Sequence, residues 1–168
     1  MEAKDLERGD VDLGVIKVDV SLGPEVGEPF PNFRYETVNE EEVRRISDLR
    51  GRFVLIDVWA TWCAPCVKAI PDLKAAAGRF DDDKVVVLSV GLDEDLDHAR
   101  KFIRDHEMDW PQALLGKRDS PMVRKKLGIS SVPLYYVLDP EGKLVHRSFR
   151  WEDAVESLEE ALATEEAK

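Results

Sequence analysis

The chain has two cysteines, Cys63 and Cys66, and their side chains are the ones best suited to covalent chemistry. A pair separated by two residues encloses too small a loop to stabilise a fold much by restricting the unfolded chain. It also cannot form the set of cross-links that holds small secreted domains together. We therefore expect a chemical role, in which a dithiol is oxidised to a disulfide and reduced again.

The residues around the pair predict that Cys63 begins a helix. Residues 54–59 are almost continuously apolar, as in a strand buried on both faces. Apolar residues at helical spacing follow the pair: Ile70, Leu73, Ala77 and Phe80. Cys63 would then lie where unpaired backbone N–H groups and the helix dipole favour an anion. Pro65 fits the first turn, where its missing N–H is not needed.

This position predicts different roles for the two sulfurs. A free thiol has a pKa of about 8.5, and a helix start can lower it to about 7, so that about half of the thiol ionises at neutral pH. We expect Cys66, one turn further along, to be more buried and to keep its proton longer. Cys63 would attack a substrate disulfide, and Cys66 would resolve the mixed disulfide.

A metal site is the main alternative for the cysteine pair. A structural zinc site needs four ligands, and the chain adds only His98, His106 and His146, without a second cysteine pair. We therefore expect no metal ion and no other cofactor. A copper- or zinc-binding module without redox turnover stays open as the alternative function.

Composition limits the partners of the chain. The 35 acidic and 24 basic residues give a net charge of −11, which disfavours binding to nucleic acid and to anionic membranes. We expect no membrane contact, because no apolar run is long enough to span a bilayer and the first twenty residues contain no signal-peptide core. The chain could be cytoplasmic, or it could be a soluble domain cut from a longer protein.

Alternating patterns along the chain predict an α/β fold with a mixed central sheet. Strands are predicted at 54–59, 85–90, 113–115, 134–138 and 144–149. Helices are predicted after Cys63, after an N-cap at Asp93, from Ser120 to Gly128, and around Trp151 to Leu162. Near-alternation of apolar residues in 11–22 indicates a strand, which could be an added edge strand or the tail of a preceding domain.

The stretch 57–66, Asp-Val-Trp-Ala-Thr-Trp-Cys-Ala-Pro-Cys, resembles the active-site stretch of the thioredoxin superfamily. The sequence of this stretch is most similar to that of the TlpA/ResA branch of thiol–disulfide proteins. Further matches are the leading segment 27–33, the helix-kinking Pro71, the loop at Val132 and Pro133, and the hairpin turn 138–142. The similarity covers residues 27–163.

The resemblance implies a thioredoxin fold, an α/β architecture whose mixed central β-sheet is flanked by helices. Residues 27–163 would form this thioredoxin-like domain. Residues 1–26 would be an N-terminal extension or linker, and 164–168 a tail. The segment from Asp93 to Gly128 would be an insertion in the TlpA/ResA style.

The resemblance also implies the residues that meet a substrate. A cis peptide bond is expected before Pro133, in a loop whose backbone, together with Val132, receives the substrate strand beside the sulfurs. Trp62 would shield the sulfurs and add apolar surface, and Ala64 and Pro65 would complete the substrate-binding site.

Asp57 is an acidic residue inside an otherwise apolar strand. Burial disfavours the charged carboxylate, so its pKa should be raised. In thioredoxins the matching acid lies behind the second cysteine and assists its proton transfer. We expect Asp57 to act as this third catalytic residue, beside Cys63 and Cys66.

The resemblance implies a thiol–disulfide oxidoreductase that acts as a reductant on protein disulfides, and the sequence leaves an oxidase or an isomerase open as alternatives. An upstream thiol would supply the electrons, the setting would be extracytoplasmic, and the protein would be a monomer.

A peroxidase of the peroxiredoxin type is disfavoured, because the spacing of Thr61 and Cys63 is not Thr-x-x-Cys. A copper-delivery protein would need one more residue between the cysteines.

Overall fold

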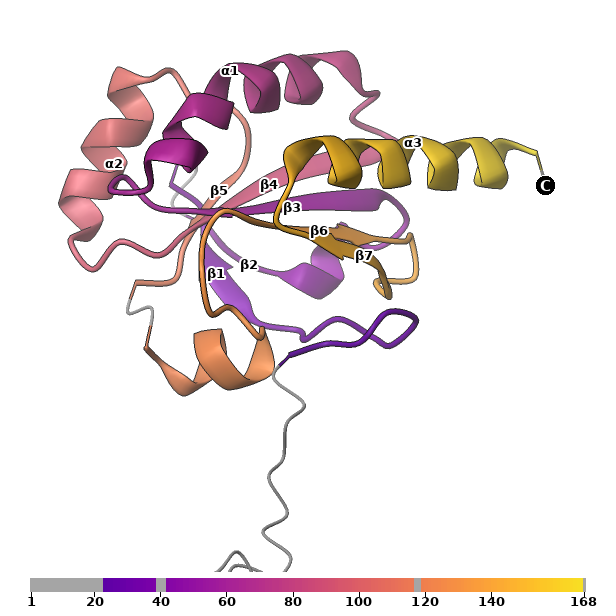
Figure 1. The fold of residues 1–168 in the computed structure, drawn as a ribbon, viewed down its shortest axis with the longest axis horizontal. Coiled ribbons are helices and arrows are strands. Elements are labelled where there is room, and N and C mark those ends of the chain that lie inside the picture. Colours follow the sequence, from indigo (N-terminus) through magenta and orange to yellow (C-terminus); the bar gives the residue numbers. More distant parts are fainter. Residues whose placement is uncertain (1–22, 39–41, 117–118, 168) are drawn as a thin grey trace, which may run out of the picture.

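The computed structural model describes residues 23–38, 42–116 and 119–167. The strand predicted within 11–22 lies outside these residues. The rest forms one central sheet with secondary structure packed on both faces (Figure 1).

The sheet has five strands in the order β5-β4-β3-β6-β7. Its strands are β3 (Phe53–Trp59), β4 (Val85–Gly91), β5 (Gln112–Leu114), β6 (Leu134–Leu138) and β7 (Leu144–Ser148). β3 pairs in parallel with β4 and antiparallel with β6, so the sheet is mixed, as predicted. All seven residues of β3 and all seven of β4 are buried, which explains their nearly continuous apolar sequence.

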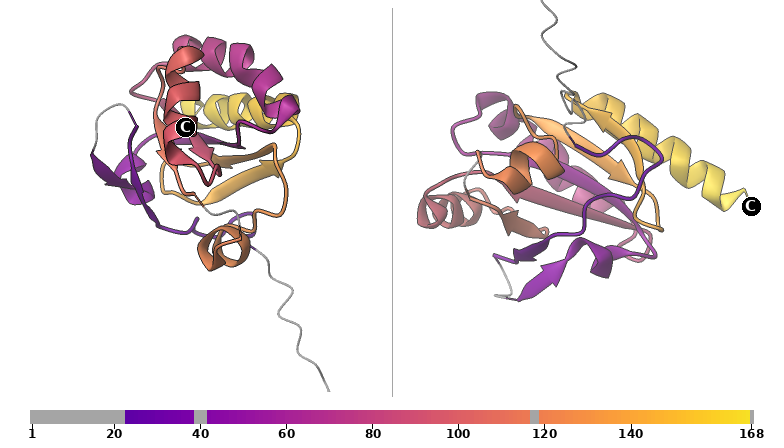
Figure 2. Two further views of the ribbon diagram at one scale, coloured as in Figure 1. Left: turned by 90° about the vertical axis from the view of Figure 1, so that its left-hand side faces the viewer. Right: turned by 90° about the horizontal axis from the view of Figure 1, so that it is seen from below.

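Three helices cover one face of the sheet, which we call the helix face (Figures 1 and 2). They are α1 (Ala64–Arg79), α2 (Leu96–Asp105) and α3 (Trp151–Glu166). The opposite face, which we call the hairpin face, is covered by β1 (Arg34–Glu36), β2 (Val43–Arg45), the 3₁₀ helix η1 (Ile46–Leu49) and the short π-helix η2 (Met122–Lys126). Each face buries its own apolar cluster.

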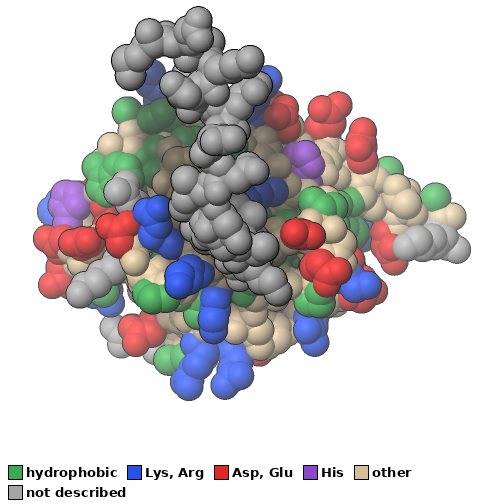
Figure 3. All heavy atoms as spheres, turned by 60° about the horizontal axis from the view of Figure 1, so that its bottom comes forward, with side chains coloured by type: hydrophobic (Ala, Val, Ile, Leu, Met, Phe, Trp, Pro, Cys, Tyr) green, Lys and Arg blue, Asp and Glu red, His purple; other side chains and the backbone are tan. Residues whose placement is uncertain are grey.

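The outer surface on the side of the hairpin face carries charges of both signs. Figure 3 brings this side forward and shows Lys and Arg side chains gathered toward the bottom of the view, with Asp and Glu side chains toward its two sides. The acidic excess of the chain is therefore not spread evenly over this surface. No helix of the described residues is long and apolar enough to cross a membrane.

Three expectations about local structure were wrong. The N-cap of α2 is Asp95, whose side chain accepts a hydrogen bond from the N–H of His98, and not Asp93. The helix predicted from Ser120 to Gly128 is reduced to the five residues of η2. α3 continues through Glu166, where the sequence predicted a tail, and this carboxylate forms an ion pair with Lys84 at 2.6 Å.

Candidate active site

The cysteine pair lies at the N-terminus of α1, as the sequence predicted. Cys63 is the N-cap residue, and a disulfide joins it to Cys66 with a Cα–Cα distance of 5.3 Å. The backbone N–H of Cys66 donates a hydrogen bond to Cys63 Sγ at 3.3 Å. The same N–H would stabilise a Cys63 thiolate in the reduced protein, together with the helix dipole.

Burial differs less between the two cysteines than expected, because Cys63 is 5% exposed and Cys66 is 2% exposed. Around them the surface is open and apolar: Trp62 is 56% exposed, and Ala64 and Pro65 are also exposed. Exposed apolar side chains therefore lie on either side of Cys63 along the chain.

The loop at Val132 and Pro133 has the geometry that the resemblance implied. The peptide bond between the two residues is cis, and both residues are half-buried just before β6. Val132 packs against the apolar clusters of both faces, and the cluster of the helix face includes Cys63 and Cys66. The loop therefore contacts the same apolar cluster as the cysteine pair.

The turn before Cys63 is fixed by an aspartate from the neighbouring strand connection. Asp93, which is 4% exposed, accepts hydrogen bonds from the backbone N–H of Thr61 at 3.0 and 3.2 Å. The hydroxyl of Thr61 donates to the same carboxylate at 2.5 Å. Asp93, which the sequence predicted as a helix cap, thus stabilises the turn that leads into Cys63 instead.

Asp57 is buried on the helix face. Its neighbours along β3 on this face, Leu55 and Trp59, belong to the cluster that contains both cysteines. Its Oδ2 accepts a hydrogen bond from the hydroxyl of Ser89 at 2.9 Å, whereas Oδ1 has no hydrogen-bond partner among the described residues. Burial raises the pKa of Asp57 to about 7, and the Ser89 hydrogen bond opposes this rise. The predicted upward shift is confirmed.

The described residues include no group of three or more His, Cys, Asp or Glu side chains that could hold a metal ion. His98 is exposed, and the ring of His106 stacks on Phe102 with centroids 3.7 Å apart. These histidines lie in or beside α2.

Sequence reasoning missed four residues that support the site. Thr61 and Asp93 hold the turn before Cys63, and Ser89 and Trp110 are linked to Asp57 by hydrogen bonds. Asp93 could have been found, because it follows a predicted strand that runs parallel to β3, and parallel strands end at the same edge of a sheet.

Comparison with known proteins decides the family. Residues 26–147 match the AhpC/TSA family. The chain belongs to this family. The chain is also similar to ResA of Bacillus thuringiensis, 25% identical over 138 residues that cover 82% of this chain and 77% of that protein. ResA of Bacillus subtilis is 29% identical over 119 residues, which cover 71% of this chain and 64% of that protein. Both relatives are named thiol-disulfide oxidoreductases.

Solved structures show the same fold. The thioredoxin domain of a thiol-disulfide oxidoreductase from Bacteroides vulgatus is 27% identical, with a TM-score of 0.73 over 81% of this chain and 96% of that one. A thiol:disulfide interchange protein from Bacteroides sp. is also 27% identical, with a TM-score of 0.72 over 82% and 90%. The thioredoxin fold and the resemblance to the TlpA/ResA branch are confirmed. A metal-binding module without redox turnover is not favoured.

Proposed function

We propose that this AhpC/TSA-family protein is a thiol–disulfide oxidoreductase that reduces disulfides of protein substrates through Cys63 and Cys66. The observation that carries the proposal is the disulfide at the N-terminus of α1, with the Cys66 N–H directed at Cys63 Sγ. The names of the ResA relatives support the same activity.

The proposed reaction moves two electrons to the substrate in two exchange steps. The thiolate of reduced Cys63 attacks one sulfur of the substrate disulfide, and the other sulfur leaves as a thiolate and takes up a proton. Cys66 then loses its proton and attacks Cys63 Sγ, which releases the second substrate sulfur as a thiol. The substrate ends as a dithiol, and Cys63 and Cys66 end as a disulfide. An upstream thiol donor would return the pair to its reduced form.

Asp57 is the proposed proton acceptor for Cys66. A group that exchanges protons at neutral pH works best when its pKa is near 7, and burial gives Asp57 a pKa of about 7. Its position on the same face as the cysteine pair supports this role.

The substrate-binding surface would combine the two apolar segments beside the sulfurs. Trp62, Ala64 and Pro65 offer exposed apolar contacts on one side. The backbone at Val132 and Pro133 would pair with an extended segment of the substrate on the other side. One copy of the chain carries all of these residues, in keeping with a monomer.

A trapping experiment tests the proposal. The variant Cys66→Ser cannot resolve a mixed disulfide, so the reduced variant should stay covalently bound to a protein with an accessible disulfide, such as insulin. Non-reducing electrophoresis would show the adduct, and added thiol should release it. The matched variant Cys63→Ser should form no adduct. An adduct of equal yield with Cys63→Ser would contradict the proposed order of attack.

A further inference from the structure

Ser89 is the residue beside Asp57 in the parallel pairing of β3 and β4. It is fully buried, at 0% exposure, in a strand that is otherwise apolar apart from its final glycine. A buried hydroxyl is costly unless it is hydrogen-bonded, and its bond to Asp57 Oδ2 at 2.9 Å meets that need. Apolar packing alone would not require a hydroxyl at this position, whereas a hydrogen bond to Asp57 does.

Trp110 orients this hydroxyl. Its indole N–H donates a hydrogen bond to Ser89 Oγ at 2.9 Å. An indole N–H can only donate, so Ser89 Oγ must accept from it, and the single hydroxyl proton is left for Asp57. The three groups form a chain in one direction, from the indole through the hydroxyl to the carboxylate.

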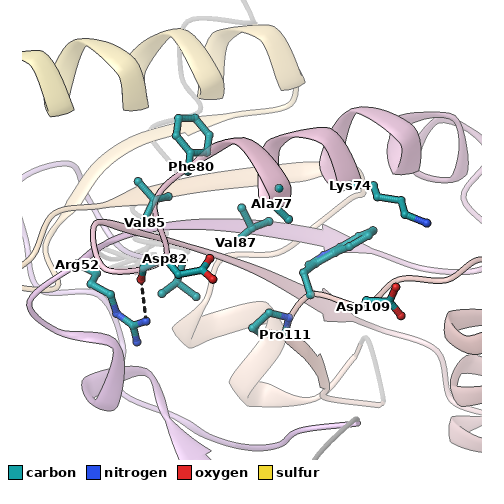
Figure 4. A pocket seen from close by; sticks show the side chains of 12 residues that line it. Arg52, Lys74, Ala77, Phe80, Asp82, Val85, Val87, Asp109 and Pro111 are labelled. Atoms are coloured by element: carbon teal, nitrogen blue, oxygen red, sulfur yellow. Dashed lines mark hydrogen bonds between the residues drawn. The ribbon is translucent and has the colours of Figure 1, made fainter.

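The surroundings hold Trp110 in place. It is 6% exposed and lines a cavity of about 540 Å³ beside β4. Phe80 and Val87 line the same cavity and are labelled in Figure 4. The backbone carbonyl of Pro111, the next residue, accepts a hydrogen bond from the N–H of Ser89 at 3.0 Å. A side-chain bond and a backbone bond thus both join residues 110–111 to Ser89 on β4.

We propose that Ser89, oriented by Trp110, is a positioning residue that occupies Oδ2 of Asp57 and leaves Oδ1 to accept the proton of Cys66. The inference rests on the proposed role of Asp57. It follows from the geometry, because one carboxylate oxygen is held by a donor and the other has no partner among the described residues.

Other titratable groups lie on the elements packed against Asp57. Tyr135 on β6 is its register partner, and burial and the charge of Asp57 raise the pKa of this phenol. Cys66 and Asp72 lie on α1, and Glu152 lies at the start of α3. No ion pair between described residues includes Asp57, so the hydrogen bond from Ser89 is the contact that stabilises its charged form.

The first test measures the carboxyl of Asp57 directly. The oxidised protein is used, because its cysteines do not titrate. With ¹³C-labelled aspartate, the Asp57 signal is assigned by its loss in Asp57→Asn, and its chemical shift is followed by NMR from pH 4 to 10. Ser89→Ala removes the donor to the carboxylate, so the midpoint should rise by about one pH unit.

Matched variants separate positioning from packing. Ser89→Thr keeps a hydroxyl and should restore the midpoint to within a few tenths of a unit. Val87→Ala removes buried volume from the same face of β4 without touching a polar group, and it should leave the midpoint unchanged. Trp110→Phe frees the Ser89 hydroxyl to rotate, so it should shift the midpoint upward by less than Ser89→Ala. An unchanged midpoint in both Ser89→Ala and Trp110→Phe would overturn the proposal.

The second test follows turnover. The pH of half-maximal rate should move upward in Ser89→Ala by the same amount, which is about a tenfold loss of rate one pH unit below the wild-type midpoint. In the Asp57→Asn background, Ser89→Ala should change nothing further. If Asp57→Asn alters the profile and Ser89→Ala does not, the role of Ser89 is wrong. If Asp57→Asn itself leaves the profile unchanged, the proposed role of Asp57 is wrong, and the role of Ser89 in the reaction is wrong with it.

Discussion

The two faces of β3 and β4 are buried to the same degree but have different compositions. Toward the hairpin face the two strands present only aliphatic side chains: Val54, Ile56, Val58, Val86, Leu88 and Val90. Toward the helix face they also present Asp57 and Ser89, both at most 1% exposed. The cysteine pair, at the start of α1, lies on the helix face.

The difference shows how one sheet separates stability from chemistry. Side chains alternate between the faces of a strand, so consecutive residues can serve different purposes. Toward the hairpin face, β3 and β4 contribute apolar burial alone. The helix face is less stabilising, because a buried carboxyl is costly, and it carries a titratable group on the same face as the cysteine pair. The following predictions test this separation, from the largest expected effect to the smallest.

The largest effect is expected at the reacting sulfur of the helix face. Cys63→Ser should lower the rate of disulfide reduction on the order of 10³-fold or more, because the nucleophile is lost. The rate is measured with insulin as substrate and dithiothreitol as electron donor, after subtraction of the uncatalysed reaction. The fold should remain intact by circular dichroism. A variant that keeps more than a tenth of the wild-type rate would contradict the assignment of Cys63.

The next effect concerns stability, and it depends on pH. A carboxyl whose pKa is about 7 when folded and 3.8 when unfolded holds its proton more tightly in the folded state, so stability falls as the pH rises from about 4 to about 7. Asp57→Asn removes this loss and should raise the free energy of unfolding at pH 8 by up to about 4 kcal/mol relative to wild type.

Urea unfolding of the oxidised proteins at pH 4 and pH 8 measures the effect. The gain from Asp57→Asn should be much smaller at pH 4, where the native carboxyl is protonated. Asp82→Asn, at an exposed position, is the control and should show no such pH dependence. A gain of equal size at both pH values would mean that charge burial is not its cause.

The hairpin face should respond in stability without a change in chemistry. Ile56→Ala, next to Asp57 in sequence but on the other face and 1% exposed, should cost about 3 kcal/mol of unfolding free energy. The pH dependence of turnover should stay that of wild type under conditions where the variant is folded. A shifted pH midpoint in this variant would show that the two faces are not independent.

The smallest effect is expected at Asp93, which holds the turn before Cys63. Asp93→Asn replaces one acceptor oxygen by a donor and removes the charge that strengthens the bonds to Thr61. We expect a loss of about 2 kcal/mol in stability. Thr61→Val removes only the hydroxyl bond and should cost less. Equal losses in the two variants would show that the backbone bond to Thr61 contributes little.

Local patterns in the sequence were enough to predict much of the fold. Continuous apolar runs predicted β3 and β4, the order of Cys63 and Pro65 predicted the start of α1, and the turn at 139–142 predicted the hairpin of β6 and β7. The raised pKa of Asp57 followed from one acidic residue in an apolar strand. Each of these inferences needs only neighbouring residues.

The missed features depend on contacts between distant residues. The bonds from Thr61 to Asp93 and from Ser89 to Asp57 each span 32 positions, and the bond from Trp110 to Ser89 spans 21. Which side chains meet depends on strand order and register, which no local pattern specifies. β1 and β2, of three residues each, are too short to show an alternation.

The redox equilibrium of the Cys63 and Cys66 pair tests the central claim most directly. The protein is equilibrated in graded thiol–disulfide buffers, and the fluorescence of its tryptophans, which include Trp62 beside Cys63, is followed. We predict a reversible two-electron transition at about −250 mV or lower, as for a reductant. A transition above about −150 mV would indicate an oxidant. Failure to form an intramolecular disulfide at any potential would contradict the account as a whole.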